Sequence, residues 1–135
     1  MSATIGDHLP EELRLRKTVG RLATYLQGYG DLLVSTNTWD PLVLKRFRDD
    51  PVVASFHPPG GAPRLIDSPS TMIDQLEHIA TLLPDEWLAP AATGTPQQCA
   101  ATAKTQLTLG ADGVILHGAS PSELAPILPA YRAIR

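Results

Sequence analysis

The stretch GTPQQCAATAKTQLTLGADGVILHGASPSEL, residues 94–124, carries the clearest structural signals in this chain. Thr95 and Gln98 have the spacing of a capping box, in which each side chain binds the backbone N–H of the other residue. A proline stands between them in the first helical position, which its fixed backbone geometry favours. These signals predict a helix over 96–109, closed by Gly110.

The second half of the same stretch predicts a strand followed by another helix. The apolar run VIL at 114–116 is typical of a strand buried on both faces, and we expect that strand over 113–117. A charge introduced at Ile115 would then lie in the core. Ser120 and Glu123 form a second capping box, and the helix after it is expected to restart near Pro126. The order helix, strand, helix is typical of parallel sheets.

Three further helices are predicted upstream. Apolar residues recur with helical spacing over 10–27, and the glycines of Gly28-Tyr29-Gly30 are expected to end that helix. Asp40 followed by proline predicts the start of a short helix that runs to about Arg48. The same cap-then-proline pattern at Ser68 predicts a helix over 69–83. The chain is therefore expected to be mostly helical.

The sequence contains no second segment with a clear strand pattern. Residues 31–38 and 52–56 are short apolar runs that fit either a strand or a turn of helix, and we favour helix or loop for 31–38. A strand at 113–117 that is buried on both faces needs neighbours at both of its edges. We therefore expect either a partner chain that completes the sheet or a chain that forms part of a larger barrel.

Composition excludes several classes of protein. The 135 residues amount to one domain, with 43% hydrophobic and 19% charged residues, which is typical of a globular fold. No apolar run reaches the roughly 18 residues that a transmembrane helix needs, and no basic, apolar leader opens the chain, so a cytoplasmic location is expected. The net charge of −3 offers no general attraction for nucleic acid or for an anionic membrane. The single cysteine, Cys99, excludes an internal disulfide.

Several segments, taken in order, resemble a known enzyme family. They are GRLATYLQ followed by YG, then NTWD, GTPQQC and LGADGVIL, at residues 20–27, 29–30, 37–40, 94–99 and 109–116. In order and spacing they are similar to the C-terminal half of the luciferase-like monooxygenase superfamily. Within it, the chain most resembles the branch that uses a deazaflavin (coenzyme F-420) in place of FMN.

The resemblance implies a fold, an activity and a set of contacts. The fold would be the C-terminal portion of a (β/α)8 TIM-barrel, and the activity that of a deazaflavin- or flavin-dependent oxidoreductase or monooxygenase. The coenzyme would lie near His117 and Gly118 after the last strand, and near Gly94 and Thr95 before the helix at 96–109. Because the first strands of such a barrel are absent, the resemblance implies a truncated or partner-dependent form.

Each candidate residue also has a structural interpretation. His117 could hold a coenzyme carbonyl or carry a proton, or it could be a half-buried histidine bonded to a loop. Gly94 and Thr95 could hold a phosphate at a helix start. The structural alternative is that Thr95 serves only as the N-cap of that helix. Cys99 is expected in the core. No metal site is predicted, because the histidines lack ligand spacing, and no catalytic residue is assigned.

Three hypotheses remain open from the sequence. The chain is an oxidoreductase that works only with partner chains, a catalytically silent binding or dimerisation module derived from that family, or an unrelated small α/β protein. The first two predict a homo-oligomer or a partner chain that completes the sheet. None of them includes a nucleic acid or a membrane as partner.

Overall fold

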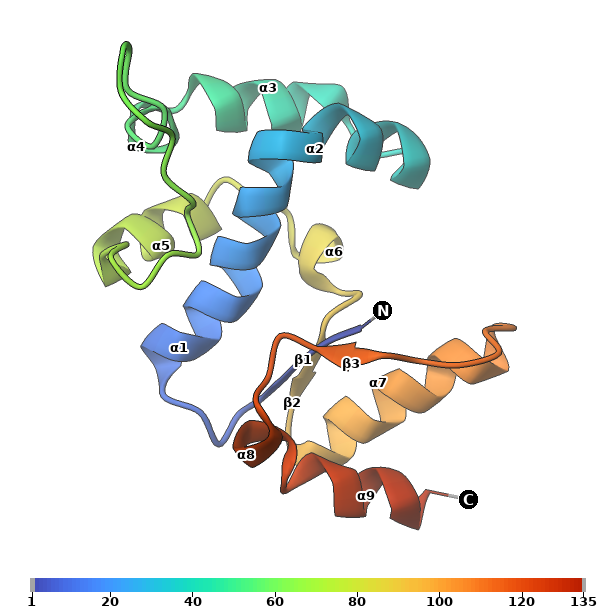
Figure 1. Cartoon of the computed structure of the whole chain (residues 1–135). Helices are drawn as coiled ribbons and strands as arrows, with labels where there is room; N and C mark the ends of the chain where they lie inside the picture. The colour runs from blue at the N-terminus through green and yellow to red at the C-terminus, as the bar shows by residue number, and fades with distance from the viewer. Residues whose placement is uncertain (1, 135) are drawn as a thin grey trace. The chain divides into compact units, whose positions relative to one another are not determined.

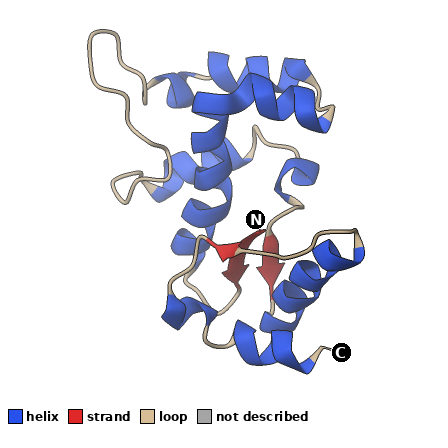
Figure 2. Ribbon diagram, turned by 45° about the vertical axis from the view of Figure 1, so that its right-hand side comes forward, coloured by secondary structure: helices blue, strands red, loops and turns tan. Residues whose placement is uncertain are grey.

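A computed structural model describes residues 2–134, and the chain divides into two compact units. Residues 1–18 together with 89–135 form one unit, and residues 19–88 form the other. Most described residues are helical, as predicted (Figure 2). No helix within residues 2–134 combines the length and the apolar character needed to cross a membrane.

The first unit contains a small parallel sheet (Figures 1 and 2). Its strands are β1 (Ser2–Gly6), β2 (Ala92–Gly94) and β3 (Leu116–His117), in the order β2-β1-β3. Thr4 pairs with Ala92 and Gly6 with Gly94 on one side of β1, while Ala3 pairs with His117 on the other. Strand β1, residues 2–6, is therefore the central strand of the sheet.

Strand β1 was not predicted. Its sequence SATIG is short and contains one large apolar residue, so it lacks a readable period. The side chains of Thr4 and Ile5 are nevertheless almost completely buried, at 0% and 1% exposure. A central strand is covered by neighbours at both edges and by side chains on both faces, which a propensity argument cannot detect.

The helices of this unit follow the sequence prediction closely. The helix expected over 96–109 is α7 (Pro96–Thr108), and the predicted restart near Pro126 separates the helices α8 and α9. The residues that pack between β2, α7 and α9 are Ala92, Cys99 and Ile127. The bounds are Pro121–Leu124 for α8 and Ile127–Ala133 for α9.

The strand expected over 113–117 is much shorter than predicted. Only Leu116 and His117 form β3, which pairs with β1 alone and has no neighbour at its other edge among the described residues. Ile115 is 64% exposed, and Leu116 is half-buried. The prediction of burial on both faces is therefore wrong, because β1 rather than this segment occupies the centre of the sheet.

The predicted fold class, a C-terminal portion of a (β/α)8 TIM-barrel, is also wrong. In such a barrel consecutive strands pair side by side, so β2 would lie next to β3. Here β1 separates them, and the described residues form three short strands with an open order. The observed architecture is a mostly helical α/β chain with a small parallel sheet.

The second unit is helical. The elements leading into it are α1 (Glu11–Leu15) and a π-helix, η1 (Arg16–Gly20). The unit itself contains α2 (Arg21–Asn37), α3 (Pro41–Asp49), α4 (Pro51–Ala54), α5 (Ile73–Ala80) and α6 (Asp85–Leu88). The helices predicted over 10–27 and from Pro41 are observed, the first with a later end, and the apolar runs at 31–38 and 52–56 are helical as far as Asn37 and Ala54.

Helix α2 continues through its predicted end. Tyr29 has non-helical angles, φ −128° and ψ 20°, so the two glycines produce a kink rather than a stop. Gly30 is buried, and a Cβ built there would lie 2.8 Å from Cδ1 of Leu44. Close packing of Gly30 in α2 against Leu44 in α3 thus accompanies the continuation of α2 past the two glycines, where the local sequence alone allows the helix to end.

Helix α5 begins later than predicted. Ser68 and the following proline lie in a turn, where the Thr71 N–H donates to the Ser68 carbonyl at 3.0 Å. The helix starts at Ile73, and Gln75 Oε1 accepts a hydrogen bond from the Met72 N–H at 3.0 Å. The prediction of a helix over all of 69–83 is therefore wrong at both ends.

A pair of matched substitutions tests this assignment of the core. Ile115→Asp is expected to change the free energy of unfolding by less than about 0.5 kcal/mol, because the side chain is exposed. Ile5→Asp is expected to cost at least about 3 kcal/mol, because it buries an unpaired charge. Urea unfolding of both variants measures the difference. Equal losses would contradict the placement of β1 at the centre.

Candidate functional site

The carboxyl edge of the β2-β1-β3 sheet is the candidate site. Gly6, Gly94 and His117 are the last residues of β1, β2 and β3. Open parallel sheets bind ligands beyond the carboxyl ends of their strands, next to the point where the strand order reverses. In the order β2-β1-β3 that point lies between β1 and β3, so the segments after these two strands are the relevant ones.

All four residues predicted as coenzyme contacts lie along this edge. Gly94 ends β2 and Thr95 follows it, while His117 ends β3 and Gly118 follows it. Because β1 separates the two pairs, they are about two strand spacings, roughly 10 Å, apart. The two pairs therefore lie at the same carboxyl edge of the sheet but are not in contact with each other.

Two residues that the sequence reasoning missed lie between these pairs. Asp7 and His8 follow β1 directly, and their side chains are exposed. The Asp7 N–H donates to the Gly94 carbonyl at 2.7 Å, which continues the pairing of β1 with β2. The His8 ring folds back over Gly6, where a Cβ would come within 2.4 Å of Nδ1. Had residues 2–6 been predicted as a strand, Asp7 and His8 would have been recognised as the residues that follow its carboxyl end.

A half-buried ion pair fixes the segment after β3. Lys17 Nζ donates to the Gly118 carbonyl at 2.8 Å and to Glu123 Oε2 at 2.7 Å. The exposed fractions of the Lys17 and Glu123 side chains are 19% and 17%. The hydrogen bond from Lys17, and then that from the Ser120 N–H, holds the pKa of Glu123 below its ordinary value. Glu123 is therefore ionised at neutral pH and unsuited to act as an acid.

The turn at Gly94 and Thr95 is occupied by its own cap. Gln98 N–H donates to Thr95 Oγ1 at 3.1 Å, and Thr95 N–H donates to Gln98 Oε1 at 2.8 Å. Gly94 has φ +96°, and a Cβ there would meet Gln98 Oε1 at 2.3 Å. The capping-box prediction is confirmed. A ligand contact at this turn stays a prediction.

Cys99 is a core residue, as expected. It is 0% exposed, and Sγ lies 3.2 Å from the Ala92 carbonyl oxygen, to which it donates. Burial, and then the nearby charge of Asp7, raise the pKa of the Cys99 thiol, which disfavours the thiolate that a nucleophile requires. Among residues 2–134 no three His, Cys, Asp or Glu side chains are grouped so as to hold a metal ion.

Comparisons with known proteins add no assignment to this edge. No family model matches the chain, and neither a curated protein nor a solved structure is significantly similar to it. The resemblance to luciferase-like oxidoreductases is consequently a hypothesis that these comparisons do not support. Conclusions about the site depend on its own chemistry.

The Lys17–Glu123 pair predicts a pH-dependent stability. Because folding lowers the pKa of Glu123, the stabilisation is complete above its ordinary pKa of 4.5 and is lost as the pH falls through the lower folded value. Glu123→Gln is expected to cost about 1 kcal/mol at pH 7 and markedly less at pH 3. Thermal unfolding of both proteins at the two pH values measures this. A penalty independent of pH would contradict the pairing.

Proposed function

We propose that this chain is the coenzyme-binding component of an oxidoreductase of the luciferase-like type. It holds a deazaflavin (coenzyme F-420) or FMN at the carboxyl edge of the β2-β1-β3 sheet and depends on a partner chain for catalysis. One observation carries the proposal: Gly94 and His117, selected from the sequence, end two strands of the same parallel sheet, and Thr95 and Gly118 directly follow them.

The groups at this edge are suited to one side of such a coenzyme. Deazaflavin and FMN combine a planar ring, with carbonyl and ring-nitrogen acceptors, with an anionic tail. His8 and His117 bring two imidazoles that can donate to ring acceptors or stack on the ring. Lys17 brings a cation, although Glu123 already balances its charge. Contacts from one side support weak binding only.

Catalysis requires groups that the edge does not provide by itself. When bound, the coenzyme would supply the hydride or electron chemistry, and the protein would supply position, electrostatics and exclusion of water. Asp7 and His8 are exposed, so they cannot exclude water from a ring. Glu123 is held ionised by Lys17. A partner chain that covers this edge would complete the site.

A titration tests the proposed function. The purified full chain is expected to bind deazaflavin or FMN weakly and to show no turnover, because only one side of the coenzyme is contacted. His117→Ala should weaken that binding further, whereas His78→Gln, a histidine of the other unit that pairs with Asp50, should leave it unchanged. Quenching of coenzyme fluorescence measures both.

The outcomes separate the alternatives. Tight, stoichiometric binding with turnover, lost in His117→Ala, would overturn the need for a partner. Binding that is identical in the wild type and His117→Ala would overturn the assignment of the edge. An absence of any binding would favour the second candidate below.

A catalytically silent assembly module is the second candidate. Two observations favour it: Thr95, Ser120 and Lys17 are already paired within the chain, and the outer edges of the short strands β2 and β3 carry no further strand among the described residues. Such edges can accept a strand from another chain. A dimer that is stable without coenzyme in sedimentation equilibrium would support this function.

A further inference from the structure

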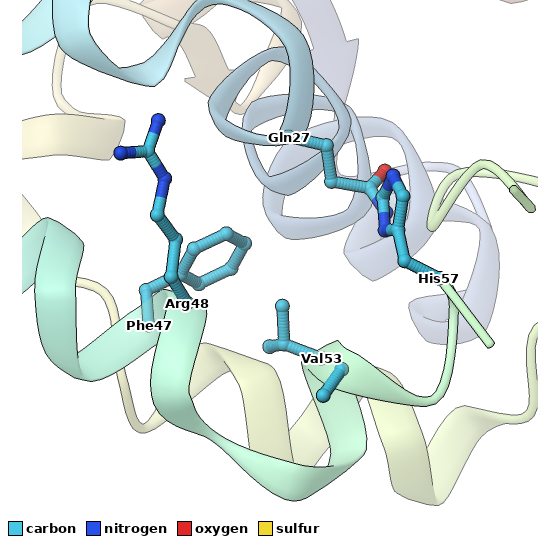
Figure 3. A pocket seen from close by; sticks show the side chains of 6 residues that line it. Gln27, Phe47, Arg48, Val53 and His57 are labelled. Carbon is cyan, nitrogen blue, oxygen red and sulfur yellow. The ribbon is translucent and has the colours of Figure 1, made fainter. Parts of the chain in front are cut away.

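The helical unit contains an open pocket of about 290 Å³ (Figure 3). Its lining comes from α2, α3 and α4 and from His57, three residues after the end of α4. The lining residues are Gln27, Phe47, Arg48, Val53, Ala54 and His57. This volume is near the lower end of the range found for small-molecule sites.

The middle of the pocket is apolar. Figure 3 shows the Phe47 ring and the Val53 side chain between the Arg48 guanidinium and the Gln27–His57 pair. Phe47 is 0% exposed and Val53 is 4% exposed, so both are anchored in the core of the unit. They form a rigid floor on which a flat or branched hydrocarbon group can pack.

One end of the pocket carries a cation that already binds a carboxylate. Arg48 Nη1 and Nη2 donate to the two carboxylate oxygens of Asp31 at 3.1 and 2.9 Å. The Asp31 side chain is 83% exposed and that of Arg48 is 42% exposed. Exposed ion pairs contribute little to stability, so another carboxylate can replace Asp31 at small cost. The fork geometry of the guanidinium selects planar carboxylates.

The opposite end of the pocket is polar. Gln27 Nε2 lies 3.3 Å from His57 Nδ1 and also donates to the Arg64 carbonyl at 3.3 Å. The Oε1 atom of the same amide is buried and has no hydrogen-bond partner among the described residues. Of the six lining residues, Arg48 alone is a lysine or arginine, so the pocket is suited to a negative charge at that end.

We propose that this pocket binds a small monocarboxylate with an aromatic or branched apolar body. The carboxylate replaces Asp31 on the Arg48 guanidinium, and the apolar body packs on Phe47 and Val53. Asp31 then acts as an internal competitor that keeps the affinity low. The site belongs to the helical unit and shares no residue with the sheet edge, so it does not depend on the proposed coenzyme function.

Titration of the full chain with benzoate, followed by heteronuclear NMR, tests the proposal. Benzoate is expected to shift the signals of residues around Phe47 and Val53, while benzamide, its uncharged analogue, should bind at least about tenfold more weakly. Arg48→Gln should lower the benzoate affinity by a similar factor. Asp31→Asn should raise it about two- to fivefold, because the internal competitor is removed.

Two controls make the test specific. Lys45→Gln removes an exposed cation of the same helix that pairs with Asp49, and it should leave benzoate binding unchanged. Circular dichroism of each variant verifies the fold. Benzoate binding that is unchanged in Arg48→Gln, or no binding by both the wild type and Asp31→Asn, would overturn the proposal, whatever the coenzyme titration gives.

Discussion

The pairing of β1 with two strands from the distant C-terminal part of the chain is the constraint on which the first unit depends. Residues 4–6 pair with β2 along one edge of β1 and residues 2–3 pair with β3 along the other, and Thr4 and Ile5 are buried. A buried backbone needs its hydrogen bonds satisfied, and these two segments supply partners along both edges of β1. The sheet therefore brings residues 2–6 together with residues 92–94 and 116–117.

The candidate site is a direct consequence of that pairing. Because the three strands are parallel, their carboxyl ends share one edge, and the segments carrying His8, Gly94 and His117 meet there. The Lys17–Glu123 ion pair then holds the segment after β3 in place. Several polar groups at this edge, among them Lys17, Thr95 and Ser120, are thus already paired within the fold.

The two proposed sites use different physical principles. The sheet edge relies on backbone ends and imidazoles gathered by strand pairing, whereas the helical pocket relies on a guanidinium beside a rigid apolar floor. They lie in different units and share no side chain. The chemistry of each site therefore has to be tested separately.

Local hydrogen bonds made several elements readable from the sequence. The capping boxes at Thr95 and Ser120 and the Asp40 cap act over three residues, so α7, α8 and α3 begin where the sequence predicts. Local patterns also located His117 at the end of a strand and Thr95 at the start of a helix.

The tertiary structure decided everything that depends on distant partners. It made the unremarkable segment SATIG the central strand, left Ile115 exposed, and carried α2 past its two glycines by packing Gly30 on Leu44. It also excluded the barrel that the resemblance implies, since strand order is a property of pairing. Strands and helix packing gain their stability from contacts far along the chain, and a local pattern carries no information about which contacts form.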